Sequence, residues 1–230
     1  MAELIFRDDA YLRACTARVV AVHEGAVELD RTVFYPMGGG QPGDTGRLGS
    51  YKVMDTRKGP AGDSILHILD SRHPDLRVGQ PVEVEIDWER RHRHMRMHTA
   101  LHLLGAVVRA PVTGGRIGED KSHLDFDIEM EKLVKEAIEA GVNALAGAAH
   151  ATRSSWITDA ELDARPDLVK TMSVAPPRGE GRVRLLEIPG LDLQACGGTH
   201  VRNTGEVSRL SVVRIRSEGK RNKRVTLALA

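Results

Sequence analysis

Three things are scarce in this sequence, and each scarcity excludes a class of protein. Aromatic residues make up 3% of the 230 residues, which argues against a protein that binds single strands by stacking their bases. The two cysteines, Cys15 and Cys196, cannot form a disulfide framework, so we expect the reducing cytoplasm as the compartment. No apolar run approaches the roughly 18 residues of a membrane-spanning helix, and no secretory signal is visible, so we expect no membrane partner.

A large net charge is also missing. Lys and Arg number 33 and Asp and Glu number 32, which leaves a formal charge of +1. This balance excludes a histone-like binder held on nucleic acid by bulk charge. With 41% hydrophobic and 28% charged residues, the composition is that of a globular protein with a core, and the length allows one or two domains. Histidine, in contrast, is clustered, since four of the 10 histidines are His92, His94, His98 and His102.

The N-terminal part of the chain predicts a small β-domain. Apolar and β-branched segments separated by turns predict short strands at 12–22, 26–29, 48–54, 64–69 and 81–86. Three consecutive glycines, Gly38 to Gly40, stand between Pro36 and Pro42, so no regular element passes through them. Short strands at regular spacing are typical of a small barrel or sandwich.

The character of the sequence changes at Asp87, a good helix N-cap that no proline follows until Pro111. We therefore expect a helix at 88–108, then a loop at 112–118, a strand at 123–128 and a second helix at 129–149. Further strands are expected at 151–157 and 182–188, a capping box at Thr158–Glu161, and a closing hairpin from 207–216 and 224–229. The predicted fold class is α+β, with one domain at 1–86 and another at 87–230.

Two pairs of potential metal ligands have the same spacing in distant parts of the chain. His98 and His102 lie four residues apart on the predicted helix, so both imidazoles share one face. Cys196 and His200 are also four apart, and the Gly-Gly between them permits a tight turn. One thiolate and three imidazoles suit Zn²⁺. Because the pairs are far apart in sequence, such a site must be assembled by a domain that already has a core.

Other interpretations of these residues remain open. His98 and His102 follow several arginines and can instead be a surface pair, and Cys196 can be a small buried residue, as we expect for Cys15. We assign His92 and His94 to a solvated basic face. A zinc protease helix would need Glu where Thr99 stands, and a base deaminase would need a Pro-Cys-x-x-Cys element that is absent.

Two further features have a structural and a functional interpretation. The Gly-rich segment 38–44 is not a Walker A loop and is either a turn of the β-domain or a backbone surface for a phosphate or substrate. The end of the chain, 206–230, is basic and is either a solvated hairpin edge or a surface that meets phosphates. Its cations are Arg209, Arg214, Arg216, Lys220, Arg221, Lys223 and Arg224, against the acids Glu206 and Glu218.

Four motifs together resemble the alanyl-tRNA editing family, the free-standing AlaX proteins related to the editing domain of alanyl-tRNA synthetase. They occur in the family's order and cover nearly the whole chain. The Gly-rich motif is typical of the family's medium form, which carries an N-terminal β-domain. The motifs are Phe34-Tyr35-Pro36-Met37-Gly38-Gly39-Gly40-Gln41, Met97-His98-Thr99-Ala100-Leu101-His102, Leu124-Asp125-Phe126-Asp127 and Cys196-Gly197-Gly198-Thr199-His200-Val201.

The resemblance implies a small β-barrel-like domain followed by an α/β editing domain with a mainly antiparallel sheet. It implies a Zn²⁺-dependent deacylase that acts on tRNA(Ala) wrongly charged with serine, and glycine is a further candidate. The implied metal ligands are His98, His102, Cys196 and His200, and the implied amino-acid pocket residue is Thr113. We add Gln41, Gly197 and Gly198 as further substrate-binding candidates. We add Lys220, Arg221, Lys223 and Arg224 as tRNA-binding candidates and expect no stable protein partner. The alternative is a non-catalytic tRNA-binding module with a structural zinc.

Overall fold

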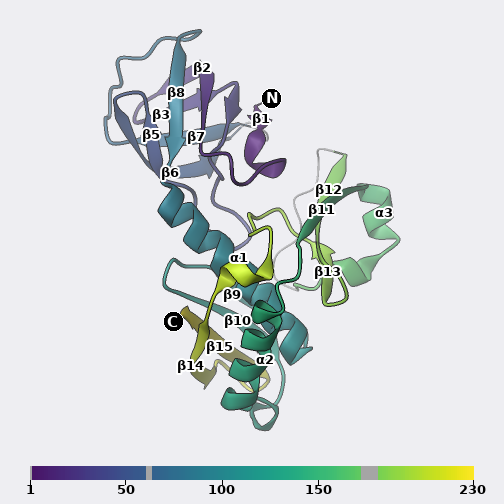
Figure 1. Ribbon diagram of the computed structural model, residues 1–230. Helices are drawn as coiled ribbons and strands as arrows, with labels where there is room; N and C mark the ends of the chain where they lie inside the picture. Colours follow the sequence, from purple (N-terminus) through teal and green to yellow (C-terminus); the bar gives the residue numbers. More distant parts are fainter. Residues whose placement is uncertain (1, 61–63, 172–180) are drawn as a thin grey trace. The chain divides into compact units, whose positions relative to one another are not determined.

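Residues 2–60, 64–171 and 181–230 are described by a computed structural model (Figure 1), and the chain divides into two units, Met1–His92 and Arg93–Ala230. Six strands of the first unit form a closed, antiparallel barrel in the order β2-β3-β7-β6-β5-β8, and β1 and β4 form a separate parallel pair. The predicted N-terminal barrel is therefore confirmed. Its elements are β1 (Glu3–Leu4), η1 (Ile5–Arg7), β2 (Ala14–His23), β3 (Ala26–Leu29), β4 (Arg31–Thr32), β5 (Gly46–Leu48), β6 (Tyr51–Lys58), β7 (Ile65–Leu69) and β8 (Pro81–Ile86).

The barrel closes because its strands alternate between apolar and polar residues. In β8, exposed and buried positions alternate along the whole strand, and Val82, Val84 and Ile86 point inward. Phe34 is fully buried in the same core. The core therefore follows from the period-two pattern of the sequence, as expected for strands with one buried face.

One histidine lies inside this apolar core. His67 is fully buried, its Nδ1 is 3.1 Å from the carbonyl of Val27, and its Nε2 is 2.8 Å from the Thr32 hydroxyl. Burial lowers the pKa of His67 to about 4. A neutral ring that donates from Nδ1 to Val27 and accepts at Nε2 from Thr32 satisfies both nitrogens. The side chain is thus a structural part of the barrel.

The helix α1 (Trp88–Val108) begins at the predicted position, with the Arg90 amide donating to the Asp87 carboxylate at 3.2 Å. Its early residue Arg91 is fully buried and pairs with the carboxylate of Asp44. Arg91 also donates to the carbonyls of Val33 and Ala10, at 2.6 and 2.9 Å. A buried charge needs such complete pairing. Arg91 therefore does not belong to a solvated face; it fixes the segment around Asp44.

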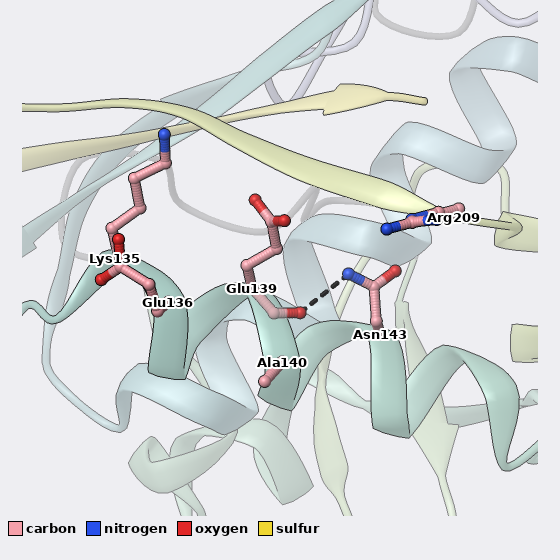
Figure 2. Close-up of a pocket in the computed structure, with 6 residues that line it drawn as sticks. All are labelled: Lys135, Glu136, Glu139, Ala140, Asn143 and Arg209. Atoms are coloured by element: carbon pink, nitrogen blue, oxygen red, sulfur yellow. Dashed lines mark hydrogen bonds between the residues drawn. The ribbon is translucent and has the colours of Figure 1, made fainter.

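The second unit contains a four-stranded sheet in the order β14-β15-β10-β9, antiparallel throughout. The helix α2 (Lys135–Gly147) lies against the edge strand, and Asn143 exchanges two hydrogen bonds of 2.9 Å with the backbone of Leu210. Figure 2 shows Asn143 and Glu139 on this helix, beside a pocket. Side chains of α2 thereby cover an edge that would otherwise invite further strands. The strands are β9 (Val112–Arg116), β10 (Lys121–Asp127), β14 (Leu210–Ser217) and β15 (Asn222–Leu229).

A smaller antiparallel sheet of three strands has the order β11-β12-β13, with its own apolar cluster against α3 (Asp159–Asp163). The predicted capping box at Thr158 and Glu161 is present at the start of α3. Its remaining elements are β11 (Arg153–Thr158), η3 (Pro166–Leu168), β12 (Arg182–Ile188) and β13 (Asp192–Ala195), and η2 (Met130–Lys132) and η4 (Thr204–Val207) complete the unit. The predicted α+β class with mainly antiparallel sheets is confirmed.

Three local expectations were wrong. The segment 112–118 is not a loop, because Val112–Arg116 pairs with β10 across its two glycines. The second helix starts at Lys135, after the short turn η2, rather than at residue 129. His94 is fully buried instead of solvated, whereas His92 is half-buried and stacks on Trp88.

Among the described residues, no helix has the length and apolar composition needed to cross a membrane.

Candidate metal centre

The four predicted ligands come together in the second unit. His98 and His102 lie one turn apart on α1, and Cys196 and His200 lie in the loop that follows β13. Their ligand atoms all lie within 4.8 Å of one another, and the three histidines are buried. Helical spacing brings the first pair to one face, whereas only the tertiary fold brings the second pair to it.

Two distances from the sulfur are close to those of a tetrahedral metal site. The Cys196 Sγ lies 3.2 Å from the His200 Nε2 and 3.6 Å from the His98 Nε2. Bonds of about 2.3 Å to sulfur and about 2.0 Å to nitrogen place neighbouring ligand atoms of a tetrahedron about 3.3–3.6 Å apart. The donor set and these two distances therefore fit a divalent metal with tetrahedral preference, and the other ligand atoms, all within 4.8 Å of one another, would move closer together around an ion.

A carboxylate that sequence reasoning missed orients His102. The His102 Nδ1 lies 2.7 Å from an oxygen of Asp192, whose side chain is 4% exposed. The other Asp192 oxygen accepts from Lys170 at 2.5 Å. Gln194 donates to the same oxygen as His102, at 2.6 Å, so Nδ1 carries the hydrogen and Nε2 faces the cluster. Such a partner fixes the tautomer and the ring orientation of a metal ligand.

Two more residues hold the second ligand pair. The Thr99 hydroxyl lies 3.2 Å from the His200 Nδ1 and 3.3 Å from the Val201 amide. The buried Arg184 donates to the carbonyls of Cys196 and Gly198, at 3.2 and 2.9 Å. Since both contacts reach the Cys-Gly-Gly-Thr-His loop, they fix its backbone in the conformation that presents the ligands. Neither residue carries a sequence signal for this role, although Thr99 lies between the two histidines.

The protonation of the cluster is close to the state that binds a metal. Burial alone would raise the pKa of the Cys196 thiol, but the neighbouring histidines, above all His98 by its charge and His102 and His200 by their hydrogen bonds, hold it well below its usual value. Burial also holds the pKa of His200 well below its usual value. Burial opposes protonation of His102, yet the hydrogen bonds to Asp192 and Cys196 outweigh it and raise the pKa to about 9. A thiolate therefore stands beside a neutral His200, and His102 carries a proton that a metal must displace.

The structure places the predicted substrate residues in different surroundings. Thr113 lies on β9, and its hydroxyl donates to the side-chain oxygen of Asn222 at 2.7 Å. Its neighbour Val112 pairs with Thr171, which directly follows Lys170. Gly197 and Gly198 lie in the ligand loop. Gln41 belongs to the first unit, where its side chain is fully buried.

The Gly-rich segment of the first unit is a hydrogen-bonded turn. Gly38 and Gln41 exchange backbone hydrogen bonds of 3.1 and 2.9 Å, and Gly39 and Gly40 have φ of +56° and +80°. The Tyr35 hydroxyl donates to the Gly38 carbonyl at 2.8 Å. Glycine is required by the left-handed backbone of this turn, which supports the structural interpretation of the motif.

The four predicted tRNA-binding residues are not equally available. Lys223 is buried and donates to the carbonyls of Gly219 and Lys220, so it closes the hairpin turn. Arg224 forms two hydrogen bonds with Asp125, at 2.7 and 2.8 Å. Arg221 pairs with Asp127 at 2.8 Å but is exposed, as is Lys220. Only the last two therefore present their charge at the tip of the hairpin.

Two family models match parts of the chain. The model described as "Threonyl and Alanyl tRNA synthetase second additional domain" matches residues 183–226, which contain Cys196 and His200. The model described as "tRNA synthetases class II (A)" matches residues 9–90. The first match covers the ligand loop and the closing hairpin of the second unit.

Relatives of known name match the chain along its length. The alanyl-tRNA editing protein AlaX-M of Methanosarcina mazei is 35% identical over 243 residues, covering 100% of this chain and 97% of the relative. The AlaX-M protein of Saccharolobus solfataricus is 35% identical over 234 residues, covering 98% of both chains. The alanine–tRNA ligase of Sulfurisphaera tokodaii is 35% identical over 225 residues, which are 92% of this chain but 24% of the ligase.

Proposed function

The chain belongs to the alanyl-tRNA editing family, and from this premise we propose that it is a free-standing Zn²⁺-dependent hydrolase that removes serine from wrongly charged tRNA(Ala). The observation that carries the proposal is the convergence of His98, His102, Cys196 and His200 in one buried cluster. In this proposal residues 87–230 hold the chemistry, and residues 1–86 form an accessory domain.

Zinc is the metal that this cluster favours. One thiolate with three imidazoles is a borderline-soft set with tetrahedral spacing, and such sets select zinc over the hard cations magnesium and calcium. When bound, the ion would supply Lewis-acid polarisation to an ester carbonyl or to a water. His98, His102, Cys196 and His200 would hold it.

The residues around the cluster support ester hydrolysis by orientation. Asp192 keeps the hydrogen of His102 on Nδ1 and so keeps Nε2 directed at the cluster. Arg184 fixes the carbonyls of Cys196 and Gly198, so the loop does not need to reorganise when substrate arrives. An aminoacyl ester is already an activated bond, so positioning of the ester and of a water supplies much of the needed acceleration.

Thr113 is our candidate for serine recognition. Its hydroxyl donates to Asn222 and keeps lone pairs that can accept a hydrogen bond from the substrate hydroxyl. Alanine has no hydroxyl, so it leaves that acceptor unpaired in the complex, and a site built on a polar contact discriminates strongly against such a substrate. Gly197 and Gly198 are further candidates because they lie between two of the proposed ligands, and Gln41 stays a prediction from the motif alone.

A second candidate function is a non-catalytic tRNA-binding module. Four protein ligands fill a tetrahedron, which is the pattern of structural zinc, whereas catalytic sites keep one position open. In this case Lys220 and Arg221 would contact the tRNA, and Lys223 and Arg224 would shape the hairpin. Such a module binds tRNA in a fixed ratio and cleaves no ester.

Deacylation of purified Ser-, Gly- and Ala-tRNA(Ala), with and without a chelator, tests the proposal. We expect multiple turnovers on Ser-tRNA(Ala), survival of Ala-tRNA(Ala), loss of activity with the chelator and its return with added Zn²⁺. Equal decay of the seryl and alanyl esters contradicts the specificity, and turnover in the presence of the chelator contradicts the metal. Binding without cleavage of any ester supports the module instead.

A further inference from the structure

The sheet β14-β15-β10-β9 has one apolar and one cationic face. Side chains alternate between the faces, so Phe126, Val225, Leu227 and Val212 share the buried side. The residues between them point to the opposite side. We call this side the cationic face and define it by Arg116, Lys121, His123, Arg214, Arg216 and Arg224.

The strand register aligns these residues in rows. His123 on β10 is paired with Arg116 on β9 and with Thr226 on β15, and Thr226 is paired with Arg214 on β14. Directly paired residues of antiparallel strands point to the same face. The row therefore crosses all four strands and ends in an arginine on each side. With strands about 4.8 Å apart, the backbones that carry the two arginines are about 14 Å apart.

The acids on and beside this face are already paired: Asp125 lies in the next row, Asp127 lies two residues further along β10 and pairs with Arg221, and Glu218 lies in the hairpin turn after β14. Asp125 binds Arg224 with two hydrogen bonds, and Glu218 lies 3.3 Å from Arg224 and also pairs with Arg216. In contrast, Arg116, Lys121 and Arg214 form no ion pair with any residue that the structure describes. The face thus has an internally neutral network flanked by three exposed cations.

His123 lies among the charged residues of this face. Burial is the main reason that its pKa is lowered, and the charges of Arg224, Arg116 and Arg216 lower it further, against the opposing charge of Asp125. Arg224 and Arg216 belong to the paired network, so Arg116 is the cation of this set that adds net positive charge beside His123. An excess of positive potential on a surface favours a polyanion.

The side chains between the cations fit a sugar–phosphate backbone better than a protein. Thr226, Ser211 and Ala228 are small or carry hydroxyls, and the one large apolar side chain near them among the described residues, Val213, lies in the bulge of β14. Protein interfaces have an apolar, often aromatic core, whereas phosphate and ribose are contacted by arginine, lysine and hydroxyl groups.

The face also leads to the proposed serine-recognition residue. Asn222 is paired with Asp127, two residues along β10 from Asp125, and accepts the hydrogen bond of Thr113. A nucleic-acid strand that crosses first the row of Arg116 and then the row of Arg224 would therefore end close to Thr113.

We propose that the cationic face binds the ribose–phosphate backbone of the tRNA and guides its charged end toward Thr113. This inference rests on the proposed function for the identity of the RNA. It adds a surface on β9 and β10 to the hairpin residues that the sequence alone indicated.

The test is the salt dependence of binding to uncharged tRNA(Ala) for Arg116→Ala, Arg214→Ala and the double variant Arg116→Glu/Arg214→Glu. Each alanine variant should lower the slope of log affinity against log salt by about 1, and the double charge reversal should weaken binding on the order of tenfold or more. The matched control is Arg153→Glu, which reverses an exposed arginine on the other sheet of the same unit.

Unchanged slopes and affinities in all three face variants overturn the proposal, and so does an equal loss in Arg153→Glu, because net charge then explains the effect. Hydrolysis of seryl-adenosine, an ester without a phosphate backbone, should proceed at the wild-type rate in every variant. If wild-type protein cleaves neither this ester nor Ser-tRNA(Ala), the proposed function is wrong, while the binding data still decide the role of the face.

Discussion

Asp192 offers the sharpest test of how the metal centre is built. Its carboxylate is 4% exposed and accepts from His102 at 2.7 Å and from Lys170 at 2.5 Å. The change Asp192→Asn keeps the shape and one acceptor for His102, but removes the charge and presents an amide donor to Lys170. The change Asp192→Ala removes the acceptor as well, and little water can replace it at a buried position.

The expected loss follows from these contacts. Removing the hydrogen-bonded partner of a metal-binding histidine typically weakens metal affinity about 10–100-fold, which corresponds to about 1.4–2.8 kcal/mol. We expect Asp192→Asn near the lower end, because the histidine keeps a partner, and Asp192→Ala near the upper end.

The assay is competition for Zn²⁺ with a chromophoric chelator at one fixed pH, with the cobalt(II) absorption spectrum as a second readout of ligand geometry. The matched control is Asp167→Asn, which removes a carboxylate from an exposed pair with Arg165 in the same unit. If both Asp192 variants fold and bind metal within twofold of wild type, Asp192 does not position His102 for the metal.

Four further outcomes are expected. Cys196→Ala should lower the metal affinity by more than about a hundredfold, since losing a ligand costs more than losing the hydrogen-bond partner of a ligand. The variant should lose deacylation as well, whereas Cys15→Ala should keep both metal binding and activity. Thr113→Val should lower the preference for Ser-tRNA(Ala) over Ala-tRNA(Ala) by about tenfold, the worth of one neutral hydrogen bond, with metal content unchanged; an unaltered preference places the serine pocket elsewhere. Metal affinity should rise with pH up to about 9, because His102 must release a proton below that pKa, and calorimetry in buffers of different ionisation enthalpy measures this release. The pKa of His67 is lowered from 6.5 to about 4, so between these pH values the unfolded chain binds a proton that the folded chain does not. The free energy of unfolding should therefore fall by about 3 kcal/mol as the pH drops from 6.5 toward 4. Urea unfolding of the wild type and of His67→Leu at several pH values measures this fall, and the same pH dependence in both proteins contradicts the prediction.

The elements that rest on local pattern were predictable. The alternation of β8 and the long run from Asp87 to Pro111 gave the barrel and α1 because one strand or one helix carries its whole signal in its own residues. The same reasoning failed at Val112–Arg116, where two glycines mimic a loop, although β10 supplies the hydrogen bonds that make it a strand. Strand β13 likewise depends on a partner strand, since its four residues pair with β12.

Burial of charged and polar residues was not predictable in the same way. Arg91 and His94 look like members of a basic helix surface, but both side chains are fully buried. A periodic pattern reports which face is apolar, and it carries no information about a polar side chain whose partner, such as Asp44, is distant in the sequence.

The sequence by itself determined the ligand types, because a His-x-x-x-His helix and a Cys-Gly-Gly-Thr-His loop restrict the chemistry wherever they lie. Only the tertiary structure decided what surrounds them: Asp192 and Lys170 behind His102, Arg184 behind the loop, and the row from Arg116 to Arg214 across four strands. The physical reason is that ligand chemistry belongs to single residues, whereas orientation and electrostatic field arise from contacts between residues that only folding brings together.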